Sequence, residues 1–250
     1  MKNTKDNKKT PWKTTDMRFV AFLDILGFKE LVMREPHRNI YKKLKRIADA
    51  KKVLKKAEDN PETCNMVGNG GIYTVTFSDS IGIFSENDNI KYFKPFIFTL
   101  RLLFIEAILS GLPLKGGIAY GKISLEKNEQ TYFGQPIIDA HLMEEEVNYM
   151  GVIVHSMEKY IENQRDKLDS KFIDKWFFEC ETPLKCGKIK HTNLNWFGSK
   201  FSENIPNNKN LVENIIKVFR LSSSGYHRKY VDNTLEMLDK LDEKHLYLYK

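Results

Sequence analysis

The order of apolar and polar residues near the start of the chain predicts a buried strand followed by two helices. Residues 18–24 are almost continuously apolar, which indicates a strand buried on both faces, and this run ends on Asp24. Gly27 follows and lets the backbone turn. Over residues 29–60 the apolar residues recur at helical spacing, and Pro36 divides this segment into a short helix and a longer one.

The next apolar segments complete an α+β pattern. Residues 72–85 place β-branched and aromatic residues on both sides of Asp79, which predicts a hairpin with this acid at its tight turn. Further along, the pattern predicts helices over residues 91–110 and 134–149 and strands over residues 114–123 and 151–154. The order strand, helix, hairpin, helix, strand is that of the ferredoxin-like split βαβ layout. We therefore expect an α+β fold with a ferredoxin-like core.

The last third of the sequence has a mixed pattern. It predicts an amphipathic segment over residues 158–178, a loop around Pro183, and two terminal helices over residues 209–221 and 226–241. The first residues are polar and rich in lysine. The chain is therefore expected to contain a flexible N-terminal arm (residues 1–16), a core domain (residues 17–156) and a C-terminal helical accessory region packed on that core (residues 157–250).

Composition agrees with a folded protein that has anionic partners. The 250 residues include 41% hydrophobic and 12% aromatic side chains, which is enough for a large core. The formal net charge of +7 suits a nucleotide or a nucleic acid. The lysines are dispersed, however, and many lie on predicted helix faces, so nucleic acid is not the partner that we favour.

Cysteine usage and hydropathy favour a cytoplasmic protein without a membrane span. The first residues are polar and do not form a secretory signal. The most apolar segment, residues 95–113, is interrupted by Arg101 and Glu106 and predicts a buried helix. An odd number of cysteines without a CxxC pair favours reduced thiols; they are Cys64, Cys180 and Cys186.

Two acidic residues of the predicted core, Asp24 and Asp79, are the main candidates for chemistry. A carboxylate at the end of a buried strand is costly unless a cation or hydrogen bonds compensate it. The split βαβ layout places the first strand beside the hairpin, so we expect the two acids to converge. Convergent carboxylates in a basic protein favour Mg²⁺ or Mn²⁺, and two such ions support an in-line displacement at phosphorus. The alternative is that Asp24 caps a helix and Asp79 is an ordinary turn residue.

Four segments resemble the motifs of class III nucleotide cyclases. The first metal motif of that family is similar to the segment Phe22-Leu23-Asp24-Ile25-Leu26-Gly27-Phe28 of this chain. The family's second motif, which carries the hairpin acid, is similar to Phe77-Ser78-Asp79-Ser80. Residues 114–121 resemble a glycine-containing strand of the family. Residues 132–144 fall where the family places the helix of its transition-state residues. Together these motifs cover roughly residues 18–155.

This resemblance implies a nucleotidyl cyclase with a two-metal site. Asp24 and Asp79 would be the catalytic acids and would hold two Mn²⁺ or Mg²⁺ ions together with the carbonyl of Ile25. The ribose 3′-hydroxyl would attack the α-phosphate and release pyrophosphate, leaving a 3′,5′-cyclic nucleotide. The triphosphate would lie against three backbone amides at a helix start, those of Gly27, Phe28 and Lys29.

Four positions depart from the pattern of class III enzymes. The lysine and the aspartate that read purine edges correspond to Val75 and Thr131 here. The transition-state asparagine and arginine correspond to Ile138 and Leu142. Because Val and Thr cannot satisfy the same base edge as a lysine–carboxylate pair, the departures fit either an inactive protein or an enzyme for a different base.

A narrower resemblance favours a pyrimidine. The two acid motifs, residues 140–144 and the C-terminal segments 183–196 and 230–234 look like those of the bacterial pyrimidine cyclases of Pycsar anti-phage systems. That family makes cyclic UMP or cyclic CMP, works as a homodimer and signals to a separate effector protein. The resemblance implies a uridylate cyclase, with a cytidylate cyclase as a close second. The rivals are a purine cyclase, a palm-type polymerase and a catalytically silent nucleotide-binding module.

Three further residues are candidates for substrate contacts. Tyr73 and Val75 share one strand face near the hairpin turn, so either is placed to touch the base, and Tyr73 can both stack and hydrogen-bond. The alternative is that both belong to the core. Lys115 is a candidate for a phosphate contact, or else a solvated lysine at a strand end. On the third helix we expect His141 to lie at the surface and Glu144 to have a structural role.

Overall fold

A computed structural model describes residues 12–58, 71–164, 166–168, 170–197, 209–222 and 225–241. Its strands are β1 (Thr15–Ile25), β2 (Ile72–Phe77), β3 (Ser80–Ser85), β4 (Leu114–Glu126), β5 (Thr131–Phe133), β6 (Val152–Val154), β7 (Phe177–Leu184) and β8 (Gly187–Leu194). Its helices are α1 (Phe28–Arg34), α2 (His37–Glu58), α4 (Ile90–Leu109), α5 (Gln135–Glu146), α6 (Glu158–Asn163), α7 (Ser170–Trp176), α8 (Lys209–Ser222) and α9 (Tyr226–Asp239).

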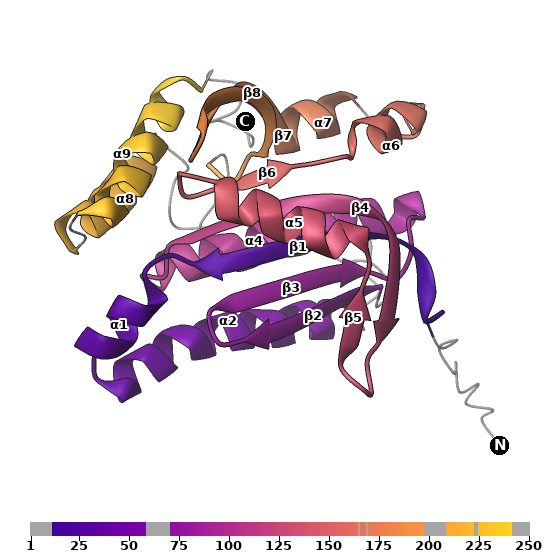
Figure 1. Cartoon of the computed structure of the whole chain (residues 1–250), viewed down its shortest axis with the longest axis horizontal. Coiled ribbons are helices and arrows are strands. Elements are labelled where there is room, and N and C mark those ends of the chain that lie inside the picture. The colour runs from indigo at the N-terminus through magenta and orange to yellow at the C-terminus, as the bar shows by residue number, and fades with distance from the viewer. Residues whose placement is uncertain are drawn as a thin grey trace.

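One sheet organises the chain, and its strand order is β2-β3-β1-β4-β6-β8-β7, with β5 paired to β4. The neighbours β2, β3, β1 and β4 are antiparallel and follow the split βαβ layout, while β6 joins β4 in parallel. Figure 1 shows this sheet running through the molecule with helices on both sides of it. The predicted α+β fold with a ferredoxin-like core is therefore confirmed.

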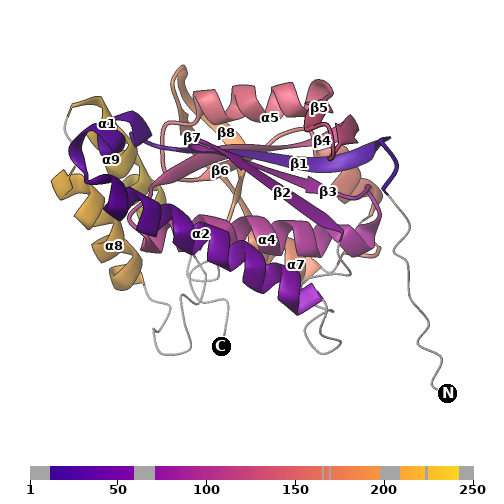
Figure 2. The same ribbon diagram turned by 90° about the horizontal axis from the view of Figure 1, so that it is seen from below.

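Helices cover the two faces of the sheet unequally. Figure 2 shows α2 and α4 on one face and α5 on the other. The larger core lies on the α2–α4 side, where alternate β1 residues such as Phe19, Ala21 and Leu23 point. A smaller apolar cluster lies under α5. Gly117 of β4 lets α5 approach closely, because a Cβ at this position would lie 2.4 Å from the carbonyl oxygen of Ala140.

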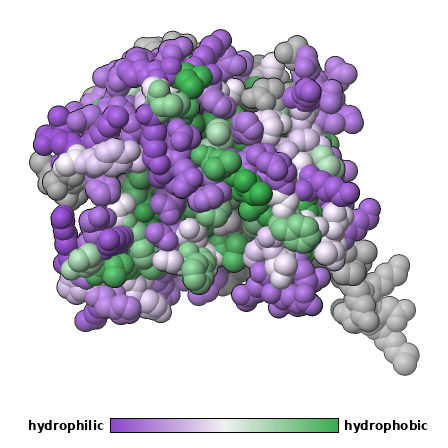
Figure 3. Space-filling model, viewed as in Figure 1, coloured by the Kyte–Doolittle hydropathy of each residue, from purple (hydrophilic) through white to green (hydrophobic). Residues whose placement is uncertain are grey.

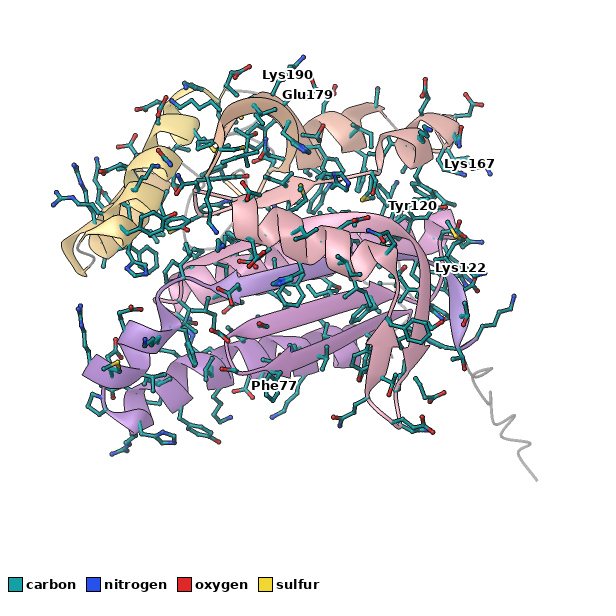
Figure 4. The ribbon with its side chains drawn as sticks, viewed as in Figure 1. Phe77, Tyr120, Lys122, Lys167, Glu179 and Lys190 are labelled. Atoms are coloured by element: carbon teal, nitrogen blue, oxygen red, sulfur yellow. The ribbon has the colours of Figure 1, made fainter. Side chains whose placement is uncertain are left out.

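The C-terminal third differs from its sequence-based prediction in the hairpin of β7 and β8. The predicted loop around Pro183 is wrong: Pro183 lies in β7, which pairs with β8 over its whole length. Proline is tolerated there because β7 is the edge strand of the sheet. Figure 4 labels Glu179 and Lys190 on this hairpin, and the side chains of these two residues form an ion pair of 2.9 Å. The two predicted terminal helices are present as α8 and α9.

The ends of the described chain bear on other sequence-based expectations. Trp12 packs edge-on against Tyr73, with ring centroids 6.4 Å apart. Lys127 Nζ lies 3.1 Å from the centre of the Trp12 ring. Most of the N-terminal arm and Cys64 lie outside the described residues, and the proposed domain division stays a prediction. Cys180 and Cys186 are free thiols. No helix in the described ranges combines the length and the apolarity that a membrane span requires.

Candidate active site

Asp24 lies near the end of β1, on the face of the sheet that α5 covers. Val20, Phe22 and Asp24 alternate with the core residues of β1, and the latter two are half-buried. In the antiparallel ladders Asp24 is opposite Ser80 of β3 on one side and Lys115 of β4 on the other. The carboxylate is therefore held at the middle of the sheet, not at a solvated edge.

Asp79 lies in the tight turn between β2 and β3, beside the end of β1. The turn is made by Ser78 and Asp79, and Ser78 adopts a left-handed conformation with φ 55°. The backbone amide of Ile25 donates a hydrogen bond of 3.1 Å to the carbonyl oxygen of Asp79. The structure thus brings the hairpin turn against the residue that follows Asp24, as the predicted strand order requires.

Burial and neighbouring charges change the acidity of Asp24. They raise the pKa of its carboxyl group to about 7, chiefly through burial, then through the negative charges of Glu144 and Asp79, while Lys115 acts in the opposite direction. The acidic end of the sheet thus has more negative charge than its own cation compensates. A divalent cation would supply the missing positive charge.

Lys115 is buried and paired, so it is not the solvated lysine of one sequence-based alternative. The residue is 7% exposed, and its Nζ lies 2.6 Å from Oε1 of Glu144 and 2.8 Å from the carbonyl oxygen of the same residue. Glu144 is itself 4% exposed. Because the last carbonyl groups of a helix lack intrahelical partners, Lys115 also caps the end of α5. A phosphate contact for Lys115 stays a prediction.

The donor set at this end of the sheet fits a hard cation that also binds substrate. Within the described ranges, no three His, Cys, Asp or Glu side chains lie close enough together to bind a metal ion by themselves. Mg²⁺ usually takes one or two carboxylates and completes its shell with water and substrate phosphates. Asp24 and Asp79, with the Ile25 carbonyl, match that requirement, and a bound cation would offset the burial and the acidic neighbours that raise the pKa of Asp24.

The turn after Asp24 forms the start of α1 and contacts the C-terminal helices. Gly27 adopts φ 69°, a left-handed conformation that favours glycine, and Phe28 and Lys29 begin the helix. A Cβ on Gly27 would lie 3.5 Å from the His227 ring of α9. A cavity of about 470 Å³ lies here between α1, α8 and α9. The triphosphate role of residues 27–29 stays a prediction.

The predicted base contacts lie on β2, within a small aromatic cluster. The hydroxyl groups of Tyr73 and Tyr132 are 2.8 Å apart, and both rings pack near Phe84. Val75 packs under the same cluster, close to Gly82. Both Tyr73 and Val75 are half-buried, so each keeps some accessible surface. A contact with the base stays a prediction for both residues.

The positions that depart from the class III pattern lie on the same side of the sheet. Thr131 is exposed at the start of β5. On α5, Ile138 is 53% and Leu142 is 47% exposed. Their apolar side chains therefore point away from the sheet and offer no hydrogen bond to a transition state. These three departures therefore lie at the surface, whereas the fourth, Val75, is half-buried.

Sequence reasoning missed the contribution of Tyr230, on α9, to this end of the sheet. Burial raises the pKa of Tyr230, as do a hydrogen bond with Tyr226 and the nearby carboxylates of Glu144 and Asp24. No local pattern predicts this, because α9 reaches the acids only through the tertiary fold. The Lys115–Glu144 pair did have a signal, since a lysine within an apolar, glycine-containing strand must find a partner if it is buried.

Comparisons with known proteins agree with this architecture. No protein-family model and no curated protein matches the sequence. Among solved structures, the catalytic core of a rhodopsin-guanylyl cyclase with converted specificity in complex with ATPαS superposes with a TM-score of 0.50 at 15% identity, over 73% of this chain and 96% of that chain. The guanylate cyclase domain of RhGC from Catenaria anguillulae in complex with GTP gives 0.49 at 15% identity, over 73% and 98% of the two chains. The chain therefore has the palm-like α+β fold of class III cyclase domains, extended by C-terminal strands and helices.

Proposed function

We propose that the protein is a metal-dependent nucleotidyl cyclase. It would convert a pyrimidine nucleoside triphosphate, UTP or CTP, into the 3′,5′-cyclic monophosphate and pyrophosphate. The observation that carries this proposal is the placement of Asp24 beside the hairpin turn of Asp79, fixed by the hydrogen bond from Ile25 to the turn. The fold that the chain shares with cyclase domains supports the same chemistry.

The chain supplies the parts that this reaction needs. Asp24, Asp79 and the carbonyl of Ile25 would hold two Mn²⁺ or Mg²⁺ ions. When bound, such ions stabilise charge on the phosphates and lower the pKa of an attacking hydroxyl group. The turn at Gly27 would present backbone amides to the triphosphate, and Lys115 fixes the end of α5 beside Asp24.

The proposal of a pyrimidine substrate rests on the residues that would contact the base. Val75 and Thr131 stand where a lysine and an aspartate would read a purine edge, and neither can replace that charged pair. Tyr73 is half-buried beside Val75 and offers a ring and a hydroxyl group. UTP is placed ahead of CTP because of the resemblance to Pycsar cyclases alone. A purine triphosphate is the alternative substrate.

A homodimer fits the surface on the α5 side. Phe77 is 82% exposed at the end of β2, where Figure 4 labels it, and Ile138 and Leu142 form an apolar stripe on α5. Figure 3 shows apolar side chains at the centre of this face. Exposed apolar patches commonly mark interaction sites. We propose that a second copy of the chain covers this patch.

Product analysis tests the proposed function. The protein is incubated with each of the four ribonucleoside triphosphates and Mn²⁺, with and without EDTA, and the products are resolved by mass. The proposal predicts cyclic UMP or cyclic CMP with pyrophosphate, and neither in EDTA. Cyclic purine nucleotides would overturn the base assignment, and linear oligonucleotides would favour a palm-type polymerase.

The second candidate function is a catalytically silent nucleotide-binding module. It is favoured by Ile138 and Leu142, which give α5 no polar group at the positions of the transition-state pair. Binding of a triphosphate without turnover in the same assay would support it. If the cyclase activity is present, the Pycsar resemblance extends the proposal to a second messenger in antiviral defence. A separate cyclic-nucleotide-responsive effector protein would then receive the signal.

A further inference from the structure

A second group of charged residues lies beside the two acids and has no part in the proposed metal site. Glu144 of α5 joins two partners: Lys115 Nζ lies 2.6 Å from its Oε1, and His141 Nδ1 lies 3.5 Å from its Oε2. His141 and Glu144 are three residues apart in one helix, so their side chains share a face. The side chain of Glu144 is buried, whereas that of His141 is half exposed.

His141 lies over the strand that carries Asp24. Its ring contacts Phe22 edge-on, with ring centroids 5.0 Å apart. Phe22 precedes Asp24 by two residues on β1, so the two side chains lie on the same face of the sheet. Lys115 is directly opposite Asp24 in the β1–β4 ladder. His141, Glu144 and Lys115 therefore border the proposed metal site.

The simplest reading of His141 and Glu144 is a pair that only stabilises α5. A half-exposed histidine adds little stability to such a pair, and the buried Glu144 does not need His141 to compensate its charge. Glu144 is held by Lys115 at both its carboxylate and its carbonyl oxygen, independently of His141. A carboxylate close to one imidazole nitrogen favours the tautomer that carries its proton on that nitrogen, which leaves the other nitrogen available for proton transfer.

We propose that His141 is a catalytic residue that accepts the proton of the attacking ribose hydroxyl, and that Glu144 and Lys115 are its positioning residues. This inference rests on the proposed cyclase function. The 3′ O–H bond breaks as O3′ bonds to the α-phosphorus, and the proton passes to Nε2 of His141. The bond from the α-phosphorus to the bridging oxygen breaks, and its electron pair leaves with pyrophosphate.

This assignment gives α5 a reactive group although the transition-state pair of class III enzymes is missing. Leu142 adjoins His141 and corresponds to the transition-state arginine of class III enzymes. A histidine that has taken up the proton is a cation, which the Glu144 carboxylate stabilises. The chain would therefore supply a positive charge from α5 during the reaction, on the helix face that lies over Phe22 and not on the outward face of Leu142.

Steady-state kinetics with UTP or CTP and Mn²⁺ test the role of His141. His141→Gln should lower kcat by about 10²–10³-fold with KM changed by less than about threefold, because general-base catalysis contributes to the chemical step. Added imidazole should partly restore His141→Ala. His155→Gln is the matched control and should retain the kcat of the unmodified protein. A His141→Gln kcat within about threefold of that value would overturn the inference while leaving the cyclase proposal intact.

The positioning role of Glu144 needs a readout other than turnover. In the metal-free protein, ¹⁵N NMR of His141 should show one dominant neutral tautomer with the proton on Nδ1, and Glu144→Gln should remove this preference. Glu145→Gln, an exposed neighbour on α5, should not. If Glu144→Gln fails to fold, the double variant Lys115→Met/Glu144→Gln removes both buried charges and serves instead. An unchanged tautomer preference would overturn the role of Glu144. No cyclic product from the unmodified protein would remove the proposed function and this inference with it.

Discussion

The acidic end of the sheet and the surface of α5 differ in chemistry although they adjoin. At the acidic end, Asp24 and the turn of Asp79 are brought together by backbone pairing, which fixes them whatever the surrounding side chains are. On the α5 surface, Ile138 and Leu142 are exposed apolar residues where a cyclase of the class III pattern carries polar ones. In the proposed enzyme, the metal ligands and the positions of the transition-state pair would therefore reside on separate elements, so that one can change while the other stays.

Removing either acid of the acidic end should have the largest effect on turnover. Asp24→Asn and Asp79→Asn should each lower kcat at least about 10³-fold, because each removes a ligand of the metal ions that stabilise the transition state. Steady-state turnover with Mn²⁺ is the measurement. Asp139→Asn on α5, which removes the charge of a carboxylate that accepts a hydrogen bond from Gln135, is the matched control. Activity of either acid variant within about tenfold of the unmodified protein would show that the acidic end is not the reaction centre.

The buried ion pair of Lys115 and Glu144 should contribute more to stability than an exposed ion pair does. Lys115→Met should lower the free energy of unfolding by about 3 kcal/mol, because it leaves the buried Glu144 carboxylate without its cation. Urea denaturation is the measurement. The control is Lys188→Met, which breaks the exposed pair with Glu236 and should cost less than about 1 kcal/mol. Equal losses in the two variants would mean that Glu144 does not depend on Lys115.

The base-reading positions can be altered without touching the acids. The double variant Val75→Lys/Thr131→Asp should raise the ratio of purine to pyrimidine turnover about tenfold, since it restores a charged pair that recognises a purine edge. The measurement is kcat/KM for all four triphosphates. Thr76→Lys, on the opposite face of β2, should leave the ratio unchanged. If the double variant also leaves it unchanged, the base does not bind at these positions.

The raised pKa of Asp24 predicts a pH-dependent effect on stability that is smaller than the effect of Lys115→Met. The raised pKa of Asp24 means that the folded protein binds this proton more tightly than the unfolded chain does. Between the ordinary carboxyl range and a pH of about 7, the free energy of unfolding should therefore fall as the pH rises. Because Asp24 is partly exposed, Asp24→Asn should stabilise the metal-free protein by only about 1 kcal/mol at pH 8. Thermal unfolding in EDTA should show less gain at pH 4, and an equal gain at both pH values would contradict the charge assignment.

The sequence predicted the core fold well because its signals are local. The apolar run that ends at Asp24, the hairpin around Asp79 and the break at Pro36 each depend on a few neighbouring residues, and their order defines the strand layout. The β7–β8 hairpin was missed because Pro183 indicates a loop unless the strand is known to lie at an edge. Edge position is a property of the whole sheet.

The candidate site was predictable in part for the same reason. The approach of the two acids follows from the strand order, whereas the buried Lys115–Glu144 pair joins a strand to the end of a distant helix. No local motif identifies His141, and only its contact with the buried Glu144 in the folded protein makes it a candidate for catalysis. Tyr230 reaches the acids from the C-terminal helices, whose position no periodicity in the sequence specifies.

The proposed function requires Asp24 and Asp79 to hold divalent metal together with a pyrimidine triphosphate. Mn²⁺ binding, followed by electron paramagnetic resonance in the presence of α,β-methylene-UTP or the corresponding CTP analogue, tests it without requiring turnover. The account predicts about two bound Mn²⁺ ions per site, and at least a tenfold loss of Mn²⁺ affinity in both Asp24→Asn and Asp79→Asn. Mn²⁺ binding of unchanged affinity and number in the two variants would contradict it.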